Sequence, residues 1–104
     1  MANSIRIRAQ AKGGETTVKA LITHPMETGM RKDKKTGEKI PAHYIQEVTC
    51  KHNGASVMTA NWGPAVSKNP YVSFILANAK AGDSIALSWT DNKGEKDTET
   101  TQVK

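Results

Sequence analysis

Apolar and polar residues alternate with period two over much of this chain, and that alternation restricts the fold to β-structure. In residues 5–11, isoleucine and alanine alternate with arginine and glutamine, as in a strand with one buried face. Residues 16–22 alternate in the same way, and the Gly13-Gly14 link between the two runs predicts a hairpin. No run shows convincingly the 3.6-residue period of an amphipathic helix.

The middle of the chain continues this pattern. Residues 42–52 place Tyr44, Val48 and Cys50 on one predicted face, with Ile45 on the other face among polar side chains. His43 falls on that polar face, so we expect it to be solvated.

Turn signals separate the remaining runs. Asn53-Gly54 is a strong hairpin signal. The predicted strands after it cover residues 55–62, 71–76, 84–89 and 96–103. Because the last run is almost entirely polar, we expect it at a sheet edge. About seven short strands predict an immunoglobulin-like antiparallel β-sandwich, without the paired cysteines of antibody domains.

Length and charge narrow the function. The 104 residues predict one domain, residues 1–104, with a modest core. A net charge of +5 allows acidic partners, but aromatic residues make up only 5% of the chain, and nucleic-acid binders usually stack bases on aromatics. The N-terminal sequence MANSIRIRAQ has no apolar segment, so it predicts neither a secretory signal nor a membrane span.

The longest predicted connection covers residues 23–44 and is basic and rich in turn residues; we call it the basic loop. Loops longer than about 12–15 residues are uncommon in compact domains and are usually functional or disordered. Its cationic and sulfur-containing side chains are Met26, Met30, Arg31, Lys32, Lys34, Lys35 and Lys39. The composition predicts a surface that a partner contacts.

Catalytic and metal-binding patterns are weak. The chain has no GxSxG elbow, no HExxH and no glycine-rich phosphate loop before a helix, so we predict no catalytic residue. A soft metal such as Cu(I) would favour its histidine, methionine and cysteine side chains, which are His24, His43, His52, Met26, Met30 and Cys50. Their spacing matches no ligand template, so we predict no metal and no cofactor. Cys50 is the only cysteine and is predicted to be a small core residue.

A second irregular connection follows Trp62. Pro64 and Pro70 stiffen this segment, which Trp62 and Tyr71 bracket. Large aromatic residues beside a stiff loop often anchor an interface, and they also often cap a core. Both interpretations stay open for Trp62 and Tyr71.

Three segments resemble the SoxZ family, whose members are subunits of a bacterial thiosulfate-oxidising sulfur carrier complex. They are HPMETGMRKDKKTGEKIPAHYI at residues 24–45, EVTCKHNGASVMTANWG at 47–63, and VSKNPYVSF at 66–74. The resemblance implies an immunoglobulin-like sandwich that binds a SoxY-like partner, whose C-terminal cysteine carries the sulfur. It implies transient contacts with the other sulfur-oxidation enzymes and a periplasmic site reached by export with a signal-bearing partner.

The resemblance transfers no catalytic residue to this chain and makes it a docking scaffold rather than an enzyme. The candidate contact residues are Met26, Met30, Arg31, Lys32, Lys34, Lys35, Trp62 and Tyr71. Without its partner, self-association of the chain through the uncovered interface would be unsurprising, and the oligomeric state of the isolated chain stays open. A basic nucleic-acid-binding module and a soft-metal or redox protein remain as alternative functions, although the leading hypothesis includes neither nucleic acid nor membrane as a partner.

Overall fold

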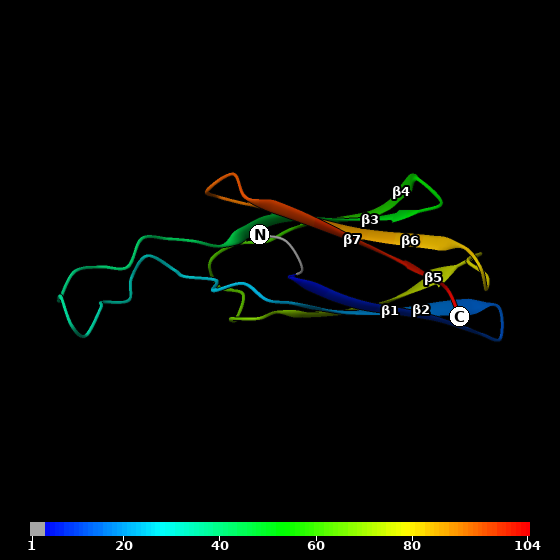
Figure 1. Cartoon of the computed structure of the whole chain (residues 1–104), viewed down its shortest axis with the longest axis horizontal. Coiled ribbons are helices and arrows are strands. Elements are labelled where there is room, and N and C mark those ends of the chain that lie inside the picture. Colours follow the sequence, from blue (N-terminus) through cyan, green and yellow to red (C-terminus); the bar gives the residue numbers. More distant parts are fainter. Residues whose placement is uncertain (1–3) are drawn as a thin grey trace.

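The computed structural model describes residues 4–104, which form two antiparallel β-sheets (Figure 1). The strands are β1 (Ile5–Lys12), β2 (Glu15–Ile22), β3 (Ile45–His52), β4 (Ala55–Asn61), β5 (Tyr71–Ala77), β6 (Ser84–Asp91) and β7 (Lys96–Gln102). The first sheet has the order β1-β2-β5 and the second has the order β4-β3-β6-β7. The prediction of an all-β sandwich of about seven strands is confirmed, and β7 lies at a sheet edge as predicted.

Both predicted two-residue turns are present. Asn53 and Gly54 have φ angles of 50° and 86°, and Gly13 and Gly14 have φ angles of 61° and 83°. Two consecutive positive φ values are what a tight hairpin between right-twisted strands requires, and these residue types adopt them at low cost. The turns therefore fix the β1-β2 and β3-β4 pairings.

The core lies between the sheets and comes from one face of each central strand. Val18 and Ile22 of β2 and Leu87 and Trp89 of β6 belong to one core cluster, and all four are at most 1% exposed. Burial of each large apolar side chain stabilises the fold by about 1.5–3 kcal/mol. The Trp89 indole N–H donates to Ser4 Oγ at 3.0 Å, so its polar atom is also satisfied.

The predicted face of Ile45 was wrong. Ile45 is fully buried, whereas the alternation placed it opposite Val48. The reason is a β-bulge: the pairing of β3 with β6 shifts register between Ile45 and Glu47. The additional residue restores Ile45 to the core side.

The molecule is long and narrow, with extents of 53 × 21 × 21 Å. Much of this length comes from the basic loop, which connects β2 to β3 and projects from one end of the sandwich (Figure 1). Among residues 4–104 there is no helix long and apolar enough to cross a membrane.

Candidate functional site

The basic loop is a two-armed ribbon rather than an irregular excursion. The backbone N–H and C=O groups of Glu27 bond both backbone groups of His43, at 2.6 and 2.9 Å. Farther out, Ile40 N–H donates to Arg31 C=O at 2.8 Å, and Asp33 N–H donates to the Glu38 C=O at 2.8 Å. The ribbon therefore carries its own backbone hydrogen bonds toward the tip.

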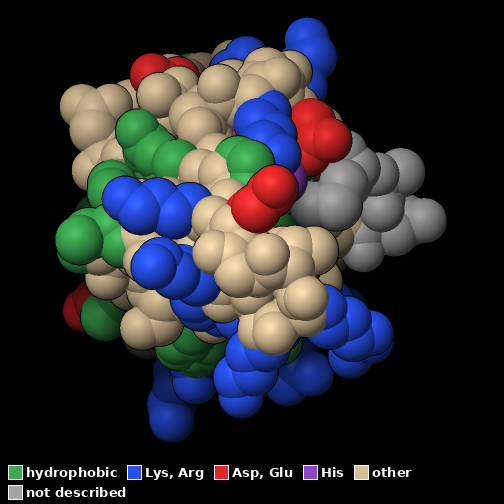
Figure 2. Space-filling view, turned by 90° about the vertical axis from the view of Figure 1, so that its left-hand side faces the viewer, with side chains coloured by type: hydrophobic (Ala, Val, Ile, Leu, Met, Phe, Trp, Pro, Cys, Tyr) green, Lys and Arg blue, Asp and Glu red, His purple; other side chains and the backbone are tan. Residues whose placement is uncertain are grey.

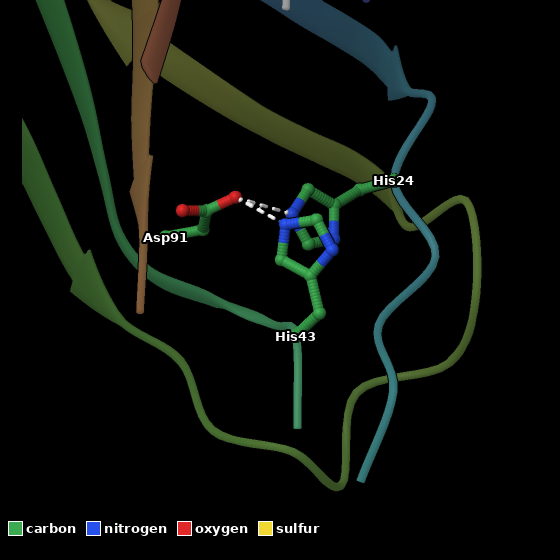
Figure 3. A group of neighbouring side chains, drawn as sticks. All are labelled: His24, His43 and Asp91. Atoms are coloured by element: carbon green, nitrogen blue, oxygen red, sulfur yellow. Dashed lines mark hydrogen bonds and ion pairs between the residues drawn. The ribbon is translucent and has the colours of Figure 1, made fainter. Parts of the chain in front are cut away.

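The base of this ribbon is a buried cluster of His24, His43 and Asp91, which we call the histidine–aspartate cluster (Figure 3). His24 follows β2, His43 precedes β3, and Asp91 ends β6. Both histidine Nε2 atoms are hydrogen-bonded to the same carboxylate oxygen, Asp91 Oδ2. The distance is 3.0 Å for His24 and 2.7 Å for His43. One carboxylate thus fastens both arms of the ribbon to the sandwich.

The other oxygen of Asp91 is also fully used. Its Oδ1 accepts backbone N–H bonds from Lys93 at 3.0 Å and Glu95 at 2.9 Å. Burial acts to raise the pKa of Asp91, but the hydrogen bonds from both histidines and both backbone N–H groups outweigh it and leave the pKa below its usual value. Asp91 is therefore a charged, fully satisfied anchor.

The hydrogen bonds of His24 decide what the cluster can do. The three possible ligand atoms lie within 4.8 Å of one another, close enough for one metal ion. However, Met26 N–H donates to His24 Nδ1 at 3.1 Å, so Nδ1 holds a lone pair and the ring proton is on Nε2. A histidine that binds metal through Nε2 normally donates its Nδ1–H to an acceptor, which is the opposite arrangement. The geometry fits a structural hydrogen-bond network.

His52 and Cys50, two of the soft side chains considered from sequence, do not join this cluster. His52 bonds Asp83 at 2.7 Å, and this pair holds the pKa of Asp83 below its usual value. Cys50 is fully buried in the core, as predicted, and desolvation raises its pKa to about 11. The structure therefore does not bring His52 or Cys50 to His24 and His43.

Two asparagines further fix the arms of the ribbon. Asn69 Oδ1 accepts the His24 N–H at 3.0 Å, and the Asn69 N–H returns to the His24 C=O at 3.0 Å. Asn92 Oδ1 accepts the Tyr44 N–H at 2.8 Å, while its Nδ2 donates to the Ala42 C=O at 2.9 Å. Each arm is thus held by side-chain bonds as well as by its own ladder.

The ribbon presents positive charge to solvent. Lys32, Lys34 and Lys35 are exposed near its tip. Figure 2 looks onto this end of the molecule, where lysine and arginine side chains outnumber acidic ones. Arg31 differs, because it pairs with Glu27 at 2.6 Å, and that hydrogen bond lowers the pKa of Glu27. The lysines therefore supply most of the uncompensated charge.

The remaining candidate contact residues are divided between core and surface. Met26 is 5% exposed and its Sδ accepts the Ile45 N–H at 3.4 Å, so it is a core residue and offers no surface to a partner. Met30 is 82% exposed and Tyr71 is 61% exposed. Trp62 is partly buried and packs against the core.

Asp91, Asn69 and Asn92 were not recognised from sequence. Asp91 and Asn92 fall between the predicted strands at residues 84–89 and 96–103, and no site role was predicted for them. His43, predicted to be solvated, instead has a side chain only 15% exposed, because it bonds to Asp91. The signal that was present is Asp91 followed by a turn, since aspartate often accepts N–H groups just downstream. The histidine contacts span dozens of residues and have no local signature.

These observations define a small all-β domain whose distinctive surface is a basic ribbon on a hydrogen-bonded base. Residues 5–102 match the family model described as "Sulphur oxidation protein SoxZ". The chain therefore belongs to the SoxZ family, and its role is in sulfur oxidation. No curated protein matches the chain.

Proposed function

We propose that this chain is the non-catalytic scaffold of a sulfur carrier complex in thiosulfate oxidation. It binds a SoxY-like partner, and the C-terminal cysteine of that partner carries the sulfur intermediates. The observation that carries the proposal is the state of Cys50, the only cysteine in the sequence. A carrier thiol must be accessible to several enzymes and must ionise readily, whereas Cys50 is buried with a pKa of about 11. In a sulfur-oxidation family, the carrying thiol then belongs to another chain.

The histidine–aspartate cluster supports the scaffold role. His24 is buried and all of its ring nitrogens are bonded within the protein, so a substrate has no access to it. The cluster instead fixes the orientation of the basic ribbon. A fixed positive ribbon is suited to guide acidic enzyme surfaces and anionic sulfur groups toward the partner's cysteine.

The proposal includes the cellular site. We propose that the chain reaches the periplasm folded onto a partner that carries a twin-arginine signal, as the resemblance to the SoxZ family implies.

Coexpression with a SoxY-like chain tests the proposal. We expect the two chains to copurify as a heterodimer. When thiosulfate is supplied together with the pathway's oxidising enzyme, which accepts the two electrons released as the thiol and thiosulfate join, we expect sulfur to be found by intact-mass analysis on the partner cysteine. Cys50→Ala should leave that sulfur loading unchanged. Separate elution of the two chains at micromolar concentration, or sulfur on Cys50, would contradict the proposal.

A further inference from the structure

The outer edge of β5 is the least protected strand edge among the described residues. The seven residues of β5 include no charged residue and no proline. By contrast, β7 carries Lys96, Asp97 and Glu99, and the pairing of β4 with β3 is broken by a bulge between Cys50 and Lys51. Charged side chains and bulges are the usual protection of sheet edges against added strands. The β5 edge has neither.

The opposite edge of the same sheet is already bonded. The Ala11 N–H donates to the Lys104 C=O at 2.8 Å, and the Lys104 N–H donates to the Ala9 C=O at 3.0 Å. The chain end therefore covers part of β1. Among residues 4–104, β5 pairs with no strand other than β2.

The register shows which backbone groups are free on β5. The Ile22 N–H bonds the Pro70 C=O at 3.0 Å, and bonded pairs alternate along an antiparallel ladder. Val72 and Phe74 therefore direct their backbone groups toward β2. The N–H and C=O groups of Tyr71, Ser73 and Ile75 point outward, where an additional strand would bond them.

The fold places this edge where related sandwiches have a further strand. In constant-type immunoglobulin domains the fourth strand, D, pairs with the fifth, E. Here the fourth strand, β4, pairs with β3 in the other sheet, so β5 has no such neighbour. The position of strand D is open.

The core is also incompletely covered on this side. Within the part of the chain that the structure describes, nine partly buried hydrophobic residues pack against the buried core, and six of them lie on β4, on β5 or between these strands. These six are Met58, Trp62, Val66, Val72, Phe74 and Leu76. A strand added to β5 would cover apolar surface that the chain itself leaves partly exposed.

The charge on the outer face of the β1-β2-β5 sheet indicates which kind of additional strand would bind at the β5 edge. The outward side chains of β1 and β2 include Arg6, Arg8, Lys12 and Lys19 against one acid, Glu15. A shallow hollow of about 300 Å³ joins Arg6, Arg8 and Lys19 to Leu21 and Tyr71. Lys19 pairs with Ser73 in the register, so a glutamate opposite this small serine would reach the lysine. A second copy of the chain would instead bring a second basic face into the same sheet.

We propose that the β5 edge binds an extended strand of the partner subunit, with acidic side chains on the outer face and apolar side chains toward the core. This inference rests on the proposed function for the identity of the partner. The backbone bonds would provide affinity, and the alternating side chains would provide specificity.

Amide hydrogen exchange, measured by NMR, tests the proposal directly. The chain is measured alone, with a SoxY-like partner, and with a blocked synthetic heptapeptide of alternating glutamate and valine. We expect the partner and the peptide to slow the exchange of the Tyr71, Ser73 and Ile75 amides. The Val72 and Phe74 amides, already bonded to β2, should change less.

Two proline variants provide the matched comparison. Ser73→Pro removes one outward donor from β5, and proline is tolerated at an edge position of this kind. Loss of one backbone bond and the added ring should weaken partner binding roughly tenfold. Thr59→Pro places the same change on the β4 edge and should leave binding unchanged.

Each outcome of these experiments is decisive. If the partner binds but the three amides stay unprotected, or Ser73→Pro binds normally, the inference is overturned while the proposed function stands. If no partner binds, the proposed function fails, and the peptide alone decides whether the edge accepts an acidic strand. Protection that rises with the concentration of the chain alone would identify a second copy as the occupant and overturn the inference.

Discussion

At the scale of single residues, Asp91 is the residue whose hydrogen bonds matter most for the structure. Its two carboxylate oxygens accept two histidine N–H groups and two backbone N–H groups. Ionised carboxylates are acceptors only and have about four lone-pair sites, so the network uses all of them. Any replacement of Asp91 must either leave a buried N–H donor without its acceptor or place a second donor against an existing one.

Asp91→Asn should therefore destabilise the protein by about 2–4 kcal/mol. An asparagine has one acceptor oxygen and an NH2 group, so the NH2 group would face either the histidines or the backbone donors. Urea unfolding followed by Trp fluorescence measures the loss. Asp83→Asn is the control, since Asp83 accepts from His52 at a partly exposed site, and we expect a smaller loss of stability there.

The same variant gives a pH dependence with a defined sign. Because the folded-state pKa of Asp91 lies below its usual value of 3.8, its stabilising effect is present above that pH and is lost as the pH falls through the folded-state pKa. The stability difference between the natural protein and Asp91→Asn should narrow in acid. An unchanged difference at about pH 2 would show that ionised Asp91 is not the source.

At the scale of elements, the strands were predictable because their signals are local. Period-two alternation and the Gly13-Gly14 and Asn53-Gly54 turns identified the strands to within a few residues. The face of Ile45 was not predictable, because a bulge depends on which strand pairs with β3. The attachment of the ribbon was not predictable either, since Asp91 meets His24 across 67 residues of sequence.

We expect the ribbon to affect function through its positive charge and to contribute little to the stability of the fold. Lys32, Lys34 and Lys35 are exposed, so replacing all three by Gln should leave the melting temperature nearly unchanged. Under the proposed function, turnover of the carrier complex by its enzymes should fall roughly threefold to tenfold at low ionic strength. Added salt should reduce the difference, because it screens exposed charges.

A charge-matched control separates location from net charge. Lys51, Lys80 and Lys104 are also exposed and lie outside the ribbon. Replacing these three by Gln changes the net charge equally and should leave turnover near that of the natural protein. Equal slowing by both triple variants would indicate a general effect of net charge and would remove the ribbon from the docking role.

At the scale of the whole molecule, the ribbon determines much of the overall shape but contributes little to the hydrophobic core. The Cα radius of gyration is 15.6 Å, whereas a compact domain of this length has a radius of about 13 Å. The additional size comes from a segment that projects from the sandwich and contributes little to the core beyond Met26. The β5 edge, by contrast, belongs to the sandwich itself. Under the two proposals made above, partner binding at the β5 edge and enzyme docking at the ribbon would occupy separable parts of the molecule.

A shortened ribbon tests this separation. Glu27 and His43 exchange both backbone hydrogen bonds, and such a pair is the geometry that a two-residue hairpin turn closes. Replacing residues 28–42 by Asn-Gly should therefore keep the histidine–aspartate cluster and Met26 in place. We expect the radius of gyration from small-angle scattering to fall by about 2 Å, toward the compact value.

The shortened chain should still bind a SoxY-like partner with the affinity of the natural protein, because the β5 edge is unchanged. Turnover of the resulting complex by the pathway's enzymes should fall at least as far as in the triple lysine variant. Loss of partner binding in a folded, shortened chain would place the partner contact on the ribbon instead. The Asp91→Asn substitution should also be made in the shortened chain. The same loss of stability there would confirm that the histidine–aspartate cluster has been retained.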